Sequence, residues 1–512
     1  MKSLKFLHYI LLVFALTIVA SCKDFLDVNV SPNATLDAPM EQVLTTATTT
    51  VGFFAGSDLH RYSALIAQQF SGQGSGATTQ PQEYERYNIQ GSDANNVWTL
   101  VYASALSDLD IIVQKAATES SPHYAGVAKI LKAYLFQVIV DTWGKAPYSE
   151  AFQTVNNVHP KFDDGQAIYD DLVKQLDQAI VDINSTSSLK SPGSNSTIYP
   201  GAWAASKPRW ERLANTLKLR MLIHQSKLRK QYVVDEITKL VNANANFMTA
   251  NADNFQMAFV NTPNNQNPIH QFEVSRPNQF FPNATLVDLM NSYTDPRRPR
   301  YFTPFPFTRP VEAGAFKGAK AGDAPSIAYS RMHSFLRGDT TNSAPATAIA
   351  TGANTGGLNA SGTGAYAYTG AAPIRMLTFA EYNFIRAEAA VYGAPGDAQT
   401  FFQAGIRASM QAAGLSTSVI DAYITANGTL PADEPGKIRR IIEEKFVANY
   451  GVILEPWSDW RRTGVPTLPV PANALFSETP RSLFYPQAEI DLNLNAPRQK
   501  NSPAERVFWD VQ

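Results

Sequence analysis

The chain has 512 residues, a formal net charge of −1 and 17% charged residues. A chain so close to neutral lacks the basic surface that nucleic-acid binding requires, so we expect no nucleic-acid partner. Its single cysteine excludes an internal disulfide framework, so stability must come from a hydrophobic core, which a chain of this length can build.

The first 22 residues have the pattern of a bacterial lipoprotein signal. A short basic start precedes an apolar run at 6–19, which is too short to span a bilayer comfortably and is typical of a signal-peptide core. The run ends in Val-Ala-Ser-Cys22, which resembles a lipobox, where the cysteine is diacylated and becomes the first residue of the mature chain. We therefore expect a signal peptide at 1–21, lipidation at Cys22 and attachment to a membrane through lipid. The alternative is a chance cysteine after an ordinary secretory signal.

The next segment, 22–40, predicts a lipidated tether, because its asparagines and prolines are poor helix formers. Beyond it, apolar residues recur at spacings of three and four over 124–143, 167–180 and 210–228, which predicts amphipathic helices. We find no comparable series of alternating strands. The pattern indicates a mainly α fold. A chain of this length could in principle form several domains, and we expect a single one over 41–512.

Residues 379–414 predict a helical hairpin, with helices at 379–392 and 398–413 joined by a Gly-Ala-Pro-Gly-Asp turn. The unit has the size of a tetratricopeptide (TPR) repeat, although the full consensus is absent. The stretches 124–180 and 208–245 can pair in the same way. We therefore expect TPR-like helix pairs that form a solenoid scaffold.

Two insertions, 71–97 and 255–372, interrupt these helices and predict long irregular loops. The first contains Tyr84 and Tyr87 amid glycine, glutamine, threonine and asparagine, whereas the second is rich in asparagine, proline and aromatic residues up to 340 and in alanine, threonine, glycine, asparagine and serine beyond it. Long loops inside a compact domain are uncommon and often carry function, so we expect ligand to bind there.

The sequence offers little catalytic chemistry. The seven histidines lack zinc-site spacing and no G-x-S-x-G elbow occurs, so we expect no metal, no cofactor and no enzyme. Two carboxylates distant in sequence can still converge as in a glycosidase. The candidates for that role form one group: Glu443, Glu444, Glu455 and Asp459. The alternative is that they are helix-surface charges or partners of Arg461 and Arg462.

Several segments, in order along the chain, resemble the SusD/RagB family of outer-membrane nutrient-binding lipoproteins. Residues 141–151 resemble the family's D-x-W-G-x-x-P-Y-x-E-A segment, and 210–220 its "W..faNsLklR" helix. Further matches lie at 169–180, 295–297, 378–389, 444–466 and 480–493. The matches cover essentially the whole chain.

This resemblance implies capture without conversion. It implies a lipoprotein of the outer membrane, facing the cell exterior, that binds oligosaccharide and delivers it to a TonB-dependent, SusC-type transporter. A peptide-binding member of the same family is the nearest alternative. A lipid-anchored glycosidase and a structural envelope lipoprotein are alternatives from other classes.

A glycan site needs aromatic planes for the sugar faces and polar groups for the hydroxyls. The candidate aromatic residues are Tyr84, Tyr87, Tyr301, Phe305 and Tyr329. Arg276 and Asn278 are the candidates for reading hydroxyls. The alternatives are that these aromatics only hold the loops on the helical body, or that the site lies around Tyr366 and Tyr368.

Overall fold

The computed structural model describes residues 38–73, 78–305, 314–324, 326, 328–341 and 366–512. The predicted signal peptide, Cys22 and nearly all of the tether lie outside these residues, so those assignments stay predictions. In the described part, helices predominate and the strands are short.

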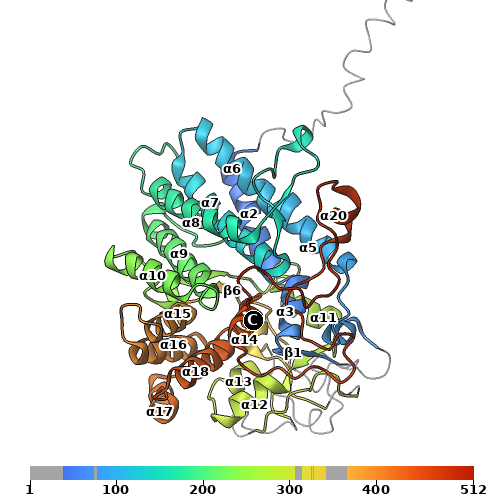
Figure 1. The fold of residues 1–512 in the computed structure, drawn as a ribbon. Helices are drawn as coiled ribbons and strands as arrows, with labels where there is room; N and C mark the ends of the chain where they lie inside the picture. Colours follow the sequence, from blue (N-terminus) through green and yellow to red (C-terminus); the bar gives the residue numbers. More distant parts are fainter. Residues whose placement is uncertain (1–37, 74–77, 306–313, 325, 327, 342–365) are drawn as a thin grey trace, which may run out of the picture.

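The longer helices lie side by side in one array (Figure 1). Its first part contains α2 (Met40–Ala55), α3 (Asp58–Ile66), α6 (Ser107–Thr118), α7 (Pro122–Trp143), α8 (Gly165–Ile183), α9 (Trp203–His224) and α10 (Lys230–Asn242). Its second part contains α15 (Phe379–Val391), α16 (Ala398–Ala412), α17 (Thr417–Asn427), α18 (Glu434–Ala448) and α19 (Glu455–Thr463). The two parts meet where α15 packs against α9 and α10. This arrangement confirms the predicted mainly α fold of TPR-like helix pairs.

The shorter helices lie mostly in the two insertions and near the C-terminus. They are α4 (Gln80–Glu85), η1 (Gly91–Ala94), α5 (Asn95–Thr99), η2 (Leu100–Leu106), η3 (Thr154–Asn156), η4 (Asn251–Asp253), α11 (Pro268–Ser275), α12 (Ala284–Ser292), α13 (Arg298–Tyr301), α14 (Ser334–Arg337) and α20 (Gln487–Leu492). The insertions are therefore less irregular than predicted. In the first, Thr79 and Gln82 form a capping box that starts α4.

The described residues contain three two-stranded antiparallel sheets, two of which involve the insertions. β1 (Phe70–Gly72) pairs with β5 (Phe280–Pro282), β2 (Ala146–Pro147) with β3 (Phe162–Asp163), and β4 (Phe255–Met257) with β6 (Ile374–Leu377). Because β4 and β6 flank the second insertion, their pairing brings its two ends together next to α15.

Most predicted helix boundaries agree closely with the structure. α7 ends at Trp143 because Gly144 follows with φ of +90°, a conformation that favours glycine. The helix predicted at 210–228 is wrong at both ends, since α9 begins at Trp203 and stops at His224. There the backbone turns, and Leu228, which extended the apolar pattern, is 37% exposed.

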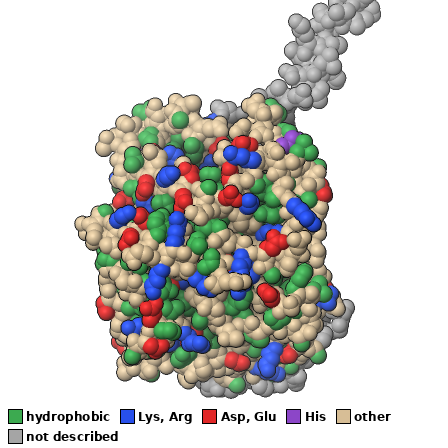
Figure 2. Space-filling view, viewed as in Figure 1, with side chains coloured by type: hydrophobic (Ala, Val, Ile, Leu, Met, Phe, Trp, Pro, Cys, Tyr) green, Lys and Arg blue, Asp and Glu red, His purple; other side chains and the backbone are tan. Residues whose placement is uncertain are grey.

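The main hydrophobic cluster runs from Met40 on α2 to Trp509 near the C-terminus. A second cluster lies between α15, α16, α17 and α18. The helical run Gly91–Thr118 is apolar and long enough to cross a membrane by composition, but its last helix, α6, packs against α2 and α7. On the face in Figure 2, basic and acidic side chains are interspersed, as the near-zero net charge predicts.

A network of buried charges crosses the core between the two parts of the array. Arg220 on α9 donates to both carboxylate oxygens of Glu381 on α15, at 2.8 and 2.7 Å, and lies 3.4 Å from Glu455 on α19. Lys445 on α18 lies 3.0 Å from Asp459 on α19. All five side chains are buried. Charged pairs of this kind join four helices that are far apart in sequence.

His224, at the end of α9, lies between two carboxylates of this network. Its Nδ1 is 3.1 Å from Asp141 on α7, and its Nε2 is 3.1 Å from Glu455. Burial alone lowers the pKa of His224, but the charges of Glu455 and Asp141 outweigh it and raise the pKa to about 9. His224 is therefore a cation at neutral pH and links α7, α9 and α19.

Removing one partner of a buried ion pair destabilises the fold strongly. Arg462 on α19 donates to both oxygens of Glu388 on α15, and both side chains are buried. We expect Glu388→Ala to lower the free energy of unfolding by about 3–5 kcal/mol, because it leaves a buried guanidinium short of a partner. Urea unfolding measures this. Asp421→Ala, which breaks the exposed Arg407–Asp421 pair, is the control and should change stability by less than about 1 kcal/mol. Equal losses in the two variants would contradict the role of the buried pair.

Raising the pH removes the stability that His224 supplies. Its pKa of about 9 in the fold exceeds the ordinary value of 6.5, so its contribution is complete below pH 6.5 and disappears as the pH rises through 9. A shift of this size corresponds to about 3 kcal/mol. We expect the stability difference between the natural protein and His224→Gln to shrink from about pH 6 to about pH 10 in urea unfolding. A difference that stays constant or grows over this range would show that His224 is not held as a cation.

Candidate ligand-binding sites

The second insertion and the helical array together enclose a cavity of about 380 Å³, here called the arginine cavity. Its walls come from α14, the segment before β6, the start of β6 and the end of α16. The lining residues are Arg300, Ser334, Phe335, Gly338, Asp339, Thr369, Ala371, Ala372, Pro373, Arg375, Ala412, Ala413 and Gly414. Most of them belong to the insertion 255–372, so this cavity lies where the sequence predicts ligand binding.

Gly338 allows the walls of the arginine cavity to come together. It follows α14 with φ of +79°, and a Cβ there would lie 2.3 Å from Thr369 Oγ1 and 2.7 Å from the backbone nitrogen of Ala371. The backbone of Thr369 donates to the carbonyl of Asp339 at 2.9 Å. A side chain at 338 would push the two segments apart, so this glycine is required by both conformation and space.

Arg375 on β6 is the most unusual side chain of the cavity. It is only 9% exposed, yet it forms no ion pair with any residue that the structure describes. Its Nη1 donates to the carbonyl of Phe335 at 3.3 Å, and its guanidinium lies 3.9 Å from the centroid of the Phe335 ring. Burial lowers the pKa of Arg375 to about 10. The cavity therefore contains a buried cation without a carboxylate to compensate it.

The Phe335 ring that contacts Arg375 is itself packed against two further aromatic rings. The Phe335 ring lies 4.4 Å from the ring of Tyr301, which in turn lies 5.0 Å from the ring of Tyr450. Tyr301 and Tyr450 are fully buried. Because these rings are packed on both sides, the position of Phe335, and through it that of Arg375, is fixed by the core.

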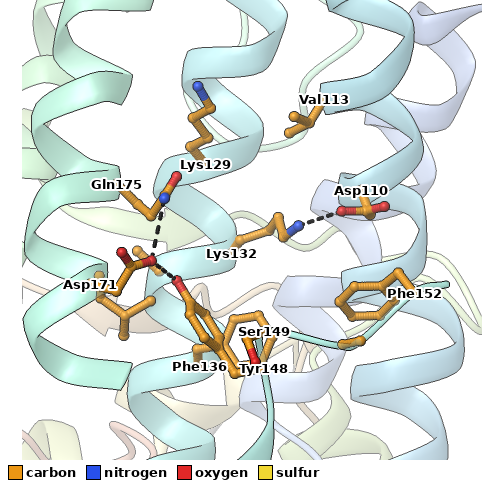
Figure 3. A pocket seen from close by; sticks show the side chains of 13 residues that line it. Asp110, Val113, Lys129, Lys132, Phe136, Tyr148, Ser149, Phe152, Asp171 and Gln175 are labelled. Carbon is orange, nitrogen blue, oxygen red and sulfur yellow. Dashed lines mark hydrogen bonds and ion pairs between the residues drawn. The ribbon is translucent and has the colours of Figure 1, made fainter. Parts of the chain in front are cut away.

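A second cavity, of about 300 Å³, lies among α6, α7 and α8 (Figure 3). Its polar groups pair with one another: Lys132 with Asp110 at 2.6 Å, and the Tyr148 hydroxyl with Asp171 at 2.5 Å. Phe152 completes the wall, with the Lys132 ammonium 5.2 Å from its ring centroid. A ligand here would have to replace interactions that the side chains already make, so this cavity is the weaker candidate.

Two further cavities lie at the C-terminal end of α7. One, of about 670 Å³, is lined in part by Lys145, Asp164 and Lys500. The other, of about 380 Å³, is lined in part by Trp98, whose Nε1 donates to Glu489 at 3.1 Å. Lys145 and Asp164 form an ion pair at 2.6 Å, and the Lys500 ammonium lies 4.9 Å from the ring centroid of Tyr485 in the same wall.

None of the seven predicted ligand-binding residues lines any of these four cavities. Four of the predicted aromatics are buried, namely Tyr84, Tyr87, Tyr301 and Tyr329. Phe305 and Asn278 are half-buried and Arg276 is exposed. Tyr366 and Tyr368, which mark the alternative site, are buried as well. Contact between these residues and ligand stays a prediction.

The buried tyrosines have internal partners. The Tyr84 hydroxyl donates to Asp93 at 3.0 Å, and the hydroxyl of Tyr87 lies 3.2 Å from that of Thr479. Arg276 lies over the Phe272 ring at 5.0 Å. In this structure, therefore, Tyr84 and Tyr87 hold the first insertion in place.

Sequence reasoning missed Arg375 and Arg300. Arg375 occurs in the short apolar run Ile-Arg-Met-Leu, which forms β6. The signal in the sequence was a charged residue inside a short apolar run. The structure adds that all four residues of this strand are buried, where a charge needs a partner.

The carboxylates considered for catalysis are mostly buried partners of basic residues. Glu444 accepts from Arg297 at 2.7 Å, Glu455 pairs with Arg220 and His224, and Asp459 pairs with Arg462 at 2.7 Å. The pairing of Asp459 with Arg462 agrees with the alternative stated from the sequence. Glu443 is half-buried and accepts a hydrogen bond from the Tyr293 hydroxyl at 3.0 Å. These groups stabilise the scaffold.

The described residues form a helical, TPR-like fold with several cavities. Residues 32–486 match the SusD-like family model described as "Starch-binding associating with outer membrane". The chain therefore belongs to the SusD-like family, as its sequence motifs indicate. No protein with a curated description matches the chain.

Several solved structures share this fold. One is described as a chitin-binding protein, with 22% identity and a TM-score of 0.75 over 93% of this chain and 100% of that one. A SusD homologue from Bacteroides fragilis has 21% identity and a TM-score of 0.71, covering 92% of this chain and 100% of that one. A chitin-binding SusD homologue from Flavobacterium johnsoniae has 20% identity and a TM-score of 0.71, covering 92% and 98%. At these identities the likeness shows the fold.

Proposed function

We propose that this protein is a lipid-anchored, outward-facing outer-membrane lipoprotein that captures oligosaccharide and delivers it to a TonB-dependent, SusC-type transporter. The observation that carries the proposal is the match to the starch-binding, outer-membrane-associated family across residues 32–486. The chitin-binding descriptions of two similar structures support a glycan as ligand. The lipobox-like sequence ending in Cys22 supports the lipid anchor.

We assign ligand capture to the arginine cavity. Its polar side chains include Ser334, Asp339 and Thr369, and the ring of Phe335 forms part of the wall. Hydrogen-bonding groups beside an aromatic ring are what a sugar requires. The wall comes largely from the second insertion, and long loops of this kind often carry binding residues.

The same cavity favours binding without catalysis. Glycosidases place two carboxylates on either side of the scissile bond. Asp339 is the one carboxylate among the residues that line the arginine cavity. The carboxylates Glu444, Glu455 and Asp459 are engaged by basic residues in the core. A captured glycan should therefore remain intact.

Replacing the cysteine of the lipobox tests the anchor. Cys22→Ala removes the thiol that would carry the acyl chains, each worth about 0.8 kcal/mol per buried CH₂. We expect the variant to be absent from the outer-membrane fraction after a carbonate wash, as shown by immunoblotting of fractions. Cys22→Ala protein that still fractionates with the outer membrane would rule out lipid anchorage through this residue.

Filling the arginine cavity tests where glycan binds. Ala412, the last residue of α16, is half-buried and lines the cavity, so Ala412→Trp should occupy it. We expect the natural protein to retain at least one glycan from a panel of neutral and acidic oligosaccharides, unchanged after incubation. Ala412→Trp should weaken that affinity about tenfold or more in calorimetry.

The matched control is Ala422→Trp, an exposed position on α17 that should leave affinity unchanged. Failure of the natural protein to retain any glycan would overturn the proposed function, and retention of peptides instead would favour the peptide-binding alternative. Equal affinities in Ala412→Trp and Ala422→Trp would place the site elsewhere. Cleaved glycan would show that the protein is an enzyme.

A further inference from the structure

We propose that the arginine cavity binds an anionic group of its glycan, the carboxylate of a uronic acid or a sulfate ester, and so selects acidic over neutral oligosaccharides. This inference rests on the proposed function and names the class of ligand that the same cavity takes. Its support comes from the charges of the cavity and from how Arg375 is held.

The first support is the contrast between Arg375 and other buried arginines. Arg220, Arg297 and Arg462 each form ion pairs with buried carboxylates. Arg386 and Arg461 are also buried and form no ion pair with a described residue, but each donates two or more hydrogen bonds to carbonyl or hydroxyl oxygens. Arg375 is 9% exposed and has only the carbonyl and ring of Phe335 as described partners. Burying a charge without a counter-charge costs free energy, and an anion entering the cavity would recover it.

The second support is the charge around the cavity. Arg300 is exposed at its rim and, like Arg375, forms no ion pair with a described residue. Asp339, also exposed, is the one acidic side chain in the wall and is not paired with either arginine. The lining therefore carries two cations against one anion. A sugar acid fits this pattern, because its carboxylate meets the arginines while its hydroxyls donate to Asp339.

The third support is that Arg375 is already held in place. Its guanidinium is fixed by the Phe335 ring and carbonyl, and the ring itself is packed on Tyr301. Little side-chain freedom is left to lose when a ligand binds. A planar guanidinium can donate two parallel hydrogen bonds to a carboxylate or sulfate, which an ammonium cannot do.

Matched pairs of glycans provide the test. Polygalacturonate and its carboxyl-reduced form differ in the carboxylate, and chondroitin sulfate and its desulfated form differ in the sulfate. The full-length protein should bind at least one acidic probe about tenfold more tightly than its neutral or desulfated counterpart. Rising salt should weaken that binding. Which pair shows the difference distinguishes a carboxylate ligand from a sulfate ligand.

Substitutions then assign the preference to the cavity. Arg375→Met should reduce the preference for the acidic probe about tenfold. Arg375→Lys should give a preference between those of the natural protein and Arg375→Met. Because Arg375 is buried, its substitution can also destabilise the fold. Arg300→Gln changes an exposed residue and therefore tests the preference for acidic glycans in a protein whose core is unchanged. The control, Arg439→Gln, removes an exposed charge from α18 and should leave binding unchanged.

The outcomes separate this inference from the proposed function. Tight binding of neutral glycans with no preference for acidic ones overturns the inference and leaves glycan capture intact. A preference for acidic probes that survives both Arg300→Gln and Arg375→Met overturns the assignment to this cavity. Loss of the preference in both cavity variants but not in Arg439→Gln supports it. Absence of binding to every probe overturns both proposals.

Discussion

The ion pair between Arg220 and Glu381 determines how the two parts of the helix array meet. It joins α9 to α15, and Glu455 and Lys445 extend it to α19 and α18. His224 adds α7 through Asp141. A buried network of this kind specifies one arrangement, because any shift of a helix would leave a charge without its partner. The rigidity of the scaffold follows from this constraint.

The arginine cavity lies at the edge of that scaffold and differs from it in one respect. In the network each basic side chain has a carboxylate nearby, whereas Arg375 has none among the described residues. The aromatic stack of Tyr450, Tyr301 and Phe335 connects the cavity to the core. The scaffold thus holds an uncompensated cation in a fixed position, which is what selective capture of an anion requires.

The helices could be predicted from the sequence because apolar spacing reports directly which face is buried. This worked for α7, α8 and the α15–α16 pair. It failed at the end of α9, where Leu228 continued the pattern but lies in a turn. The spacing of apolar residues along the sequence does not show at which residue a helix ends in the folded protein.

The candidate site was less predictable. The second insertion, which the sequence predicts to bind ligand, supplies much of the wall of the arginine cavity. Its predicted tyrosines are packed inward, since aromatic composition does not show which way a ring faces. Tyr301 illustrates this, because its ring lies beneath Phe335 and not in the cavity. Arg375 could not be placed, because β6 pairs with β4, more than a hundred residues earlier in the chain.

Amide hydrogen exchange of the full-length protein, with and without a glycan that it retains, tests whether ligand binds in the arginine cavity. We expect new protection of the backbone around 334–339, 369–375 and 412–414, the segments that line the arginine cavity. Exchange in α7, α9 and α15 should not change, because the charge network already fixes these helices. Protection confined to 148–152 and the facing parts of α6, α7 and α8 would contradict binding in the arginine cavity. It would place the ligand in the cavity among these three helices.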